Sequence, residues 1–548
     1  MILQKKLQAV TISLSLGVAN PINAQESPYR YWPTYKKTPI EACLEQKWNA
    51  QDTIENGWDF SLPPSVTVSP KSYLVFARVF SLKQNTKLPP VNIKANPVLS
   101  IWVPWKELEI GKDQYDFTRL KSIVEAAATS GYGVEIRPLT AIAAKKGDRE
   151  QRSVPDYVAA YDTPIFTAPP GKGDRVSHYD PSHPDFHRRY LKFVEAFGKS
   201  GIAKNPVVKS IVVGYSSPSF GDERIGPHGM DWKNEPPHVK ERLDAWAQAC
   251  EGVTNKVMMC GDSAHGFSKG FGTRGGFVEN YMYRIPEPSI GQFMDSKGYL
   301  SIDETAPVIE NRGLNGEENE EYEEKWAGPN GRFGKTTESF PYRYFSSTLR
   351  SIQMRVNIVL LNPFSLYPEL TTYLSLQMGR TVNDTPDVWC FLRENQMRGG
   401  TPCKNYERWL YQRDSEGYET EAVLPVSMPV RQWMIANGRD TDLIARAGKK
   451  MGFAVDDRFL PETPQPVTFK ITFYDGVKGT LNLVYQNGTG TVSYPIVSTG
   501  EDVMRTATVH TTALFKAKDF AYDFEIYSPE KVPVSIVRIV KSPKISNP

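Results

Sequence analysis

Eight short apolar runs, separated by helical stretches, restrict the fold more than any other feature of the chain. The helical stretches have three-to-four spacing, as in residues 117–131, where Leu120, Ile123, Val124 and Ala127 share one face. Parallel strands that alternate with helices close most economically into a barrel, so we predict an α/β fold with a (β/α)8 TIM barrel. The predicted strands are residues 73–80, 98–105, 133–140, 208–215, 256–263, 276–285, 306–313 and 356–363.

The sequence divides into four predicted parts. Residues 1–24 have the basic start, apolar centre and small final residue of a cleaved signal peptide, and the apolar stretch is too short to span a bilayer. We therefore expect a protein exported to the periplasm or secreted from a bacterium. Residues 25–71 are expected to wrap the barrel, and residues 72–425 to form it, with residues 385–425 as a helical closing segment. Residues 426–548 alternate in the manner of an antiparallel β-sandwich, with Phe473, Tyr474 and Tyr485 in its core.

The charge balance and the cysteines limit the partners and cross-links that the chain can be expected to have. The 65 basic and 62 acidic residues give a net charge of +3, which indicates neither a nucleic acid nor a membrane as partner. Of the five cysteines, Cys250 could bridge to Cys260 and Cys390 to Cys403, and buried free thiols are the alternative. No spacing resembles a zinc site, so we expect neither a metal nor a cofactor. The oligomeric state is left open.

Polar residues follow several of the predicted strands. Active sites of TIM barrels lie at the carboxyl ends of the strands, so these residues are the candidates. Asp222 and Glu223 follow strand four, and Glu310 lies in strand seven. Two carboxylates that face each other across a barrel mouth suit glycoside hydrolysis, in which one protonates the leaving oxygen and the other attacks the sugar.

The segment at residues 100–138 resembles the second strand, the turn W-x-x-L-E-x-x-x-G-x-Y-D-F, the helix and the third strand of clan A glycoside hydrolases, and more narrowly of the β-galactosidases of family 42, with Asp113 at the glycine position of the turn. Residues 180–215 resemble the helix and strand that lead to the acid/base residue of that group. The resemblance covers about residues 73–365 and implies a retaining enzyme. It places the nucleophile at Glu310 and the acid/base at Glu223. Because the order here is Gly221, Asp222, Glu223, Asp222 is the rival for that role.

Further candidates could bind the substrate, which we expect to be an oligosaccharide or polysaccharide. Aromatic faces and hydrogen-bonding groups at strand ends suit sugar rings, although each could instead be a core residue. A surplus of arginines favours an anionic sugar, such as a sulfated algal galactan, with ordinary ion pairing as the alternative. The set is Trp102, Trp105, Arg137, Tyr215, Arg224, Asp262, His265, Tyr281, Tyr283, Arg284, Asn311, Arg312 and Trp326.

Other interpretations are weaker. A serine hydrolase with Ser263 and His265 is disfavoured, because residues two apart on a strand do not form a nucleophile elbow and no G-x-S-x-G motif occurs. A glycan-binding barrel without catalysis, or a polysaccharide lyase, is the remaining alternative. The acidic run at residues 317–325 is interpreted as the solvated start of a helix rather than a metal site.

Overall fold

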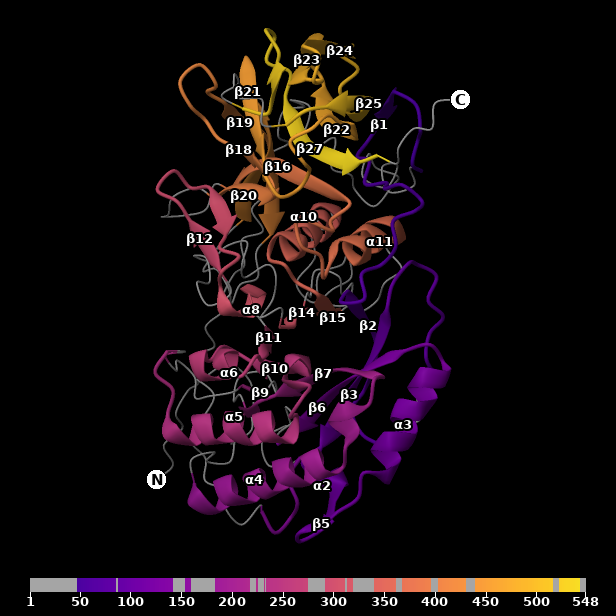
Figure 1. Cartoon of the computed structure of the whole chain (residues 1–548), viewed down its shortest axis with the longest axis vertical. Coiled ribbons are helices and arrows are strands. Elements are labelled where there is room, and N and C mark those ends of the chain that lie inside the picture. The colour runs from indigo at the N-terminus through magenta and orange to yellow at the C-terminus, as the bar shows by residue number, and fades with distance from the viewer. Residues whose placement is uncertain are drawn as a thin grey trace, which may run out of the picture.

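The computed structural model describes residues 47–84, 87–140, 153–158, 183–216, 223–224, 231, 233–274, 291–310, 313–318, 340–360, 367–395, 403–429, 439–515 and 522–542. Figure 1 shows two stacked bodies, an indigo and magenta barrel below and an orange and yellow group of strands above. Helices α10 (Phe340–Gln353) and α11 (Pro368–Gln377) lie between the two bodies.

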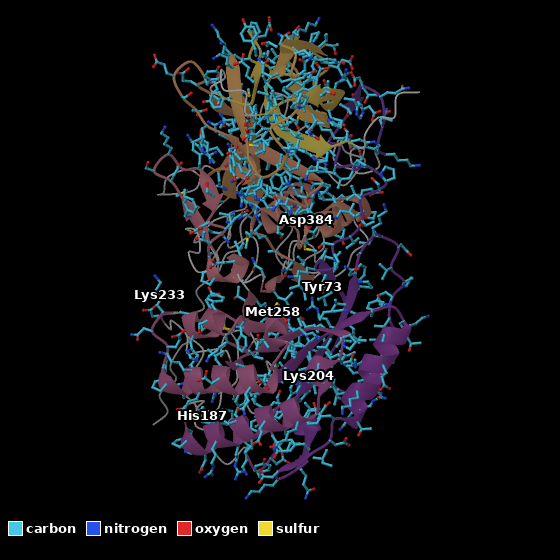
Figure 2. All side chains as sticks on the ribbon, viewed as in Figure 1. Tyr73, His187, Lys204, Lys233, Met258 and Asp384 are labelled. Atoms are coloured by element: carbon cyan, nitrogen blue, oxygen red, sulfur yellow. The ribbon has the colours of Figure 1, made fainter. Side chains whose placement is uncertain are left out.

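Eight parallel strands close into a barrel, which confirms the predicted fold. Side chains from five of these strands, among them Val75, Val98, Val212 and Met258, form one apolar cluster and therefore fill the barrel interior. Figure 2 marks Met258 and Tyr73 in this part of the molecule. In chain order the strands are β2 (Tyr73–Val79), β3 (Pro97–Pro104), β6 (Gly133–Leu139), β7 (Val208–Val213), β10 (Val257–Cys260), β11 (Gly272–Arg274), β14 (Asn315–Glu318) and β15 (Ile358–Leu360).

Amphipathic helices connect the strands. In α3 (Thr118–Thr129) the predicted apolar face is buried at Leu120, Val124 and Ala127. Helix α4 (Pro184–Lys199) is followed by Gly201, whose φ of 71° suits the end of a helix. The other connecting elements are α2 (Trp105–Leu108), β4 (Glu109–Gly111), β5 (Gln114–Tyr115), η3 (Ile202–Lys204), α5 (Pro237–Ala249), η4 (Thr254–Lys256), α6 (Ala264–Ser268), β12 (Gln292–Met294), β13 (Leu300–Ile302) and α8 (Pro307–Glu310).

Two of the eight predicted strands are wrong. The sixth barrel strand is β11 at residues 272–274, before the predicted residues 276–285, and it pairs with β10 and β14. The predicted seventh strand at residues 306–313 contains helix α8 instead, and the seventh strand is β14. The acidic run at residues 317–325 therefore begins within a strand, not a helix.

Two antiparallel sheets form the upper body, as predicted for the sandwich. The larger has the order β1-β25-β22-β27-β16-β20-β19, with β17 paired to β16, and the smaller has the order β18-β21-β26-β23-β24. Phe473, Tyr474 and Tyr485 are buried, as expected. The strands are β1 (Thr53–Asn56), β16 (Asp387–Asn395), β17 (Cys403–Arg408), β18 (Leu410–Gln412), β19 (Glu421–Pro429), β20 (Arg439–Ala447), β21 (Lys450–Val455), β22 (Gln465–Asp475), β23 (Gly479–Gln486), β24 (Thr491–Ser498), β25 (Val503–Ala513), β26 (Phe524–Tyr527) and β27 (Val534–Lys541).

The sandwich also contains two segments that the sequence analysis assigned to the barrel. The described parts of the predicted closing segment, residues 387–395, 403–408, 410–412 and 421–429, are strands β16 to β19 of the upper sheets rather than helices that close the barrel. In the N-terminal segment, β1 pairs with β25, and Asp59 forms an ion pair with Lys470 of β22. Hydrogen bonding to a sheet edge thus attaches this segment to the sandwich, where we expected it to wrap the barrel.

A buried ionic network joins α11 to the larger sheet. Arg538 donates to Asp387 Oδ2 through Nη2 (2.7 Å) and Nε (2.9 Å), and Tyr373 Oη donates to the same oxygen (3.1 Å). Gln377 Nε2 donates to Asp387 Oδ1 at 2.5 Å. Each partner satisfies the buried charge of another, as a buried ion pair requires.

Four cysteines, Cys250, Cys260, Cys390 and Cys403, lie among the described residues and form no disulfide bridge there. Neither of the two bridges that the sequence allows is formed. Burial raises the pKa of Cys250 to about 12. This thiol therefore stays protonated at neutral pH and behaves as a small apolar side chain.

Candidate active site

A buried carboxylate lies inside the barrel, near the middle of three adjacent strands and below the barrel mouth. Glu135 on β6 accepts hydrogen bonds from Ser100 Oγ (2.6 Å) on β3 and from Ser210 Oγ (3.2 Å) on β7. The strand register places these three residues side by side. Ser100 lies two residues after Val98 of the interior cluster, so the alternation of the strand directs all three residues inward.

The charge of Glu135 is balanced by arginines. Arg137 Nε donates to Glu135 Oε1 at 2.7 Å, and both side chains are buried. Burial alone would raise the pKa of Glu135, but the charge of Arg137, hydrogen bonds from Ser100 and Arg137, and the charge of Arg274 hold that pKa below its ordinary value. Glu135 is therefore ionised at neutral pH and fixes the position of Arg137.

An aromatic stack continues from this cluster to the barrel mouth. Trp102 Nε1 donates to Ser100 Oγ (2.9 Å), and Arg137 Cζ lies 4.6 Å from the Trp102 ring centroid. Phe80, immediately after β2, packs against Trp102 with centroids 5.3 Å apart and remains 44% exposed. Phe80 is not among the substrate-binding residues predicted from sequence, although its place at the end of the first apolar run was an available signal.

Strands five and six add an acid and a cation. Asp262 follows β10, and its Oδ1 accepts a hydrogen bond from Thr273 Oγ1 of β11 (2.7 Å). Arg274, the last residue of β11, is buried and its Nη1 lies 3.5 Å from Cys260 Sγ. The structure thus brings Asp262 and Arg274 to the same rim as Arg137.

The predicted acid/base residue lies on a hairpin directly after strand four. Strand β8 (Tyr215–Ser216) pairs antiparallel with β9 (Glu223–Arg224), with Ser216 opposite Glu223 and Tyr215 opposite Arg224. Strand β9 also lies beside β10. The hairpin returns Glu223 to the carboxyl end of β7. Its rival Asp222 lies outside the described residues.

The placement of Glu310 at the end of strand seven is wrong. Glu310 is exposed and ends helix α8, which precedes β14, so it lies at the amino side of the strand rather than at the mouth. The acids at the carboxyl end of strand seven are Glu317 and Glu318. An added Cβ at Gly316 would meet Met258 and Ile358 of the interior cluster, so Gly316 faces inward. Glu318 occupies the strand position of the same parity.

Two other predicted site residues have structural contacts instead. Trp105 is fully buried, and its Nε1 donates to Glu109 Oε2 (2.6 Å) while its ring packs on Phe193. His265 pairs with Asp244 of the outer helix α5 (2.9 Å), so it is directed away from the barrel mouth.

The contacts of Ser263 at the start of α6 argue against the serine-hydrolase pair. Ser263 Oγ accepts the Gly266 amide (3.0 Å) at the start of α6 and donates to Glu235 (2.6 Å). Ser263 is buried and caps helix α6, and the His265 side chain forms its hydrogen bond with Asp244 rather than with Ser263. The predicted candidates Tyr281, Tyr283, Arg284, Asn311, Arg312 and Trp326 lie outside the described residues.

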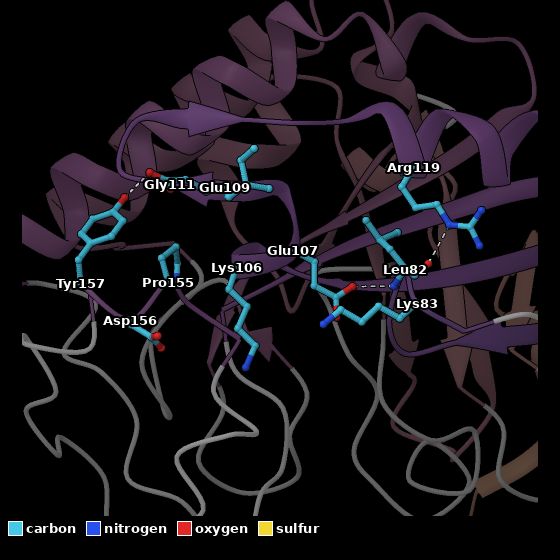
Figure 3. Close-up of a pocket in the computed structure, with 11 residues that line it drawn as sticks. Leu82, Lys83, Lys106, Glu107, Glu109, Gly111, Arg119, Pro155, Asp156 and Tyr157 are labelled. Carbon is cyan, nitrogen blue, oxygen red and sulfur yellow. Dashed lines mark hydrogen bonds between the residues drawn. The ribbon is translucent and has the colours of Figure 1, made fainter.

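A pocket of about 1010 Å³ lies among the loops that follow strands β2, β3 and β6. Figure 3 shows its wall, with Glu107 accepting the Leu82 amide (2.6 Å). Glu109 accepts hydrogen bonds from Trp105, from the Asp113 amide (2.9 Å) and from Tyr157. Glu107 and Glu109 of this segment thus hold in place the loops that shape the pocket.

Among the described residues, no three His, Cys, Asp or Glu side chains come together as a group that could hold a metal ion. The same part of the chain has no helix with the length and apolarity to cross a membrane.

No family model matches the chain, and no curated protein matches it. Solved structures with similar chain courses include the catalytic domain of a β-amylase from Paenibacillus polymyxa, with 9% identity, a TM-score of 0.31, and coverage of 55% of this chain and 97% of that one. A thermostable mutant of a xylanase from Cellvibrio japonicus has 9% identity and a TM-score of 0.30, over 56% and 97% of the two chains.

An exo-β-1,4-mannosidase from Opitutaceae bacterium strain TAV5 has 10% identity and a TM-score of 0.24, over 52% of this chain and 48% of that one. At these TM-scores the similarities support no conclusion about activity. The barrel itself is established by the strand register of this chain.

Proposed function

We propose that the protein is an exported, retaining glycoside hydrolase that cleaves β-glycosidic bonds in oligosaccharides, with β-galactosidase-like chemistry. One observation supports this proposal above the others: strands four and seven of a closed barrel both end in carboxylate-bearing segments. The resemblance of residues 73–365 to clan A glycoside hydrolases assigns the acid/base and the nucleophile to these two strands.

In the proposed reaction, Glu223 protonates the glycosidic oxygen as its bond to the anomeric carbon breaks. Asp222 is the alternative for this role. A strand-seven glutamate attacks the anomeric carbon, and the resulting ester is hydrolysed by water, which Glu223 deprotonates. Retention of configuration requires the two carboxyl groups to lie about 5 to 5.5 Å apart.

We assign the nucleophile to Glu318 rather than to Glu317. Glu318 has the parity of the inward-facing Gly316, and successive residues of a strand face opposite sides. The arginines near the strand ends support an anionic sugar as substrate, since guanidinium groups pair with sulfate or carboxylate oxygens. Arg137 and Arg274 are two such arginines with buried side chains, and Glu135 holds the first of them in place.

Activity screening with product analysis tests the proposal. The full chain would be incubated with oligosaccharides from agar, carrageenan, xylan, β-mannan and pectic galactan, each sulfated substrate beside its desulfated form. Anomeric NMR of the first product should show that the β-configuration is retained. The sulfated form of a substrate should be turned over faster than its desulfated form. Binding without any bond cleavage would favour the non-catalytic glycan-binding alternative, an inverted product would contradict retention, and an unsaturated product would indicate a lyase.

A further inference from the structure

An exposed aromatic ring stands at the carboxyl end of the first barrel strand. Phe80 follows β2 directly and is 44% exposed, although a phenylalanine ring gains free energy when it is buried. Val79 belongs to the core cluster that includes the buried face of α3, so the alternation of the chain turns Phe80 to the opposite side, toward the mouth. The other exposed aromatic side chains among the described residues, Phe293 and Tyr527, lie in β12 and in the sandwich strand β26.

The ring of Phe80 rests on a support of buried side chains. It packs against Trp102 with ring centroids 5.3 Å apart and an interplanar angle of 61°. Trp102 is fixed in turn, because its Nε1 donates to Ser100 Oγ (2.9 Å) and Arg137 Cζ lies 4.6 Å from its ring centroid. The position of the exposed ring is therefore set by the barrel wall beneath it.

The loop that begins at Phe80 is fastened at successive residues. Phe80 N donates to Gln84 Oε1 at 2.7 Å. Ser81 Oγ donates to Glu107 Oε1 (2.7 Å), and Leu82 N donates to Glu107 Oε2 (2.6 Å), the second of which is drawn in Figure 3. A ring on a loop that is already ordered loses little conformational entropy when a ligand binds to it.

Trp102 was one of the predicted substrate-binding residues, but its surroundings suit the role of a support. It is only 8% exposed, and the guanidinium of Arg137 lies over its ring. A sugar ring packs its C–H groups against an accessible aromatic face, while its hydroxyl groups remain free for polar partners. Among the described aromatic residues at the mouth, Phe80 has the accessible ring.

We propose that Phe80 is a substrate-binding residue, on which one pyranose ring of the oligosaccharide stacks through its C–H groups. This inference rests on the proposed function, because it takes the barrel mouth as the site of the substrate. A phenyl ring has no group that can transfer a proton or attack the sugar, so the stack contributes to binding rather than to bond cleavage. Loss of the ring should therefore raise KM with little change in kcat.

Titration calorimetry with the full chain tests the inference. Binding of the oligosaccharides from the activity screen would be measured in a background of Glu223→Gln with Glu318→Gln, which the proposed mechanism predicts to be inactive. Phe80→Ala should weaken the tightest binding about tenfold, and Phe80→Leu, which keeps bulk against Trp102 but no flat face, about fivefold.

Two further variants serve as controls. Phe80→Tyr keeps the aromatic face and should bind within about twofold of the parent. Phe293→Ala removes a phenylalanine ring that is similarly exposed, at 47%, but lies in the hairpin β12–β13, and it should also stay within about twofold.

The inference is overturned if Phe80→Ala binds as tightly as the parent, if Phe293→Ala weakens binding equally, or if no oligosaccharide binds the parent. Equal binding by Phe80→Leu and Phe80→Tyr would also overturn it, because bulk alone would then account for the contact. Phe80-dependent binding without cleavage by the unmodified chain would retain the stacking residue and contradict the hydrolase. Cleavage with binding that Phe80→Ala leaves unchanged would do the reverse.

Discussion

The four strands in the first half of the barrel contain six to eight residues each, whereas the four in the second half contain three or four. The long strands hold the buried network of Glu135, Ser100 and Ser210. Two of the short strands, β11 and β14, instead end in charged residues, Arg274 and Glu318. We therefore call the first half, strands β2, β3, β6 and β7, the framework, and we expect the second half to provide reactive residues.

The largest expected effect on stability comes from breaking the buried ion pair of the framework. Glu135→Gln would leave Arg137 buried without its counter-charge, and breaking a buried pair in this way typically costs about 3–5 kcal/mol. We expect that loss in the free energy of unfolding of the barrel, measured by urea denaturation. Glu241→Gln, at an exposed helix position, is the control and should change it by less than about 0.5 kcal/mol. A similar, small effect of both variants would show that the framework does not depend on Glu135.

A smaller loss of stability is expected where the short strands β11 and β14 approach each other closely. Gly272 of β11 has no room for a side chain, because an added Cβ would lie 1.9 Å from Leu314 O. Gly272→Ala should therefore destabilise the protein by about 1–3 kcal/mol through displacement of β14. Gly490→Ala, where an added Cβ meets nothing within 4 Å, is the control. Equal unfolding free energies for the two variants would contradict the tight packing of β11 on β14.

The pH dependence of stability should also come from the framework. The pKa of Glu135 is lower in the folded than in the unfolded chain, so its ionised form stabilises the fold above its ordinary pKa near 4.5. That contribution is lost as the pH falls through the pKa of the folded state. Each unit of difference between the folded and unfolded pKa contributes about 1.4 kcal/mol. Thermal unfolding midpoints between pH 7 and pH 3 should fall less steeply for Glu135→Gln than for the unmodified chain. Parallel curves would remove Glu135 as the source.

The smallest effect is expected at Glu310. It is exposed at the end of α8, so Glu310→Gln should change the free energy of unfolding by less than about 0.5 kcal/mol. Circular dichroism during thermal unfolding would measure this. A large loss of stability would mean that the amino side of β14 depends on this carboxylate.

The same contrast explains which elements could be predicted from sequence. The long strands of the first half are buried runs of Val, Ile and Leu, which carry their own signal, and the sandwich strands alternate clearly. Strand β14 has the sequence Asn-Gly-Glu-Glu and forms only because β11 and β15 pair with it on either side. No local pattern in those four residues indicates a strand.

The apolar residues just before β14 misled the sequence analysis for a physical reason. Pro307 stands at the first position of α8, where its fixed φ and missing amide favour a helix start. The run from Ala306 to Ile309 therefore buries Val308 as one turn of helix rather than as a strand. The strand assignment placed the predicted nucleophile at Glu310, which lies before β14, whereas Glu223 does follow strand four as expected.

The most direct test of the central claim compares Glu318→Gln with Glu310→Gln and Glu317→Gln on the best substrate from the screen. We predict that Glu318→Gln lowers kcat by roughly 10⁴-fold or more, as loss of a nucleophile does, while the other two variants keep near-normal rates and all three stay folded. Normal turnover by Glu318→Gln, or its loss in Glu310→Gln, would contradict the assignment of catalysis to the carboxyl end of β14.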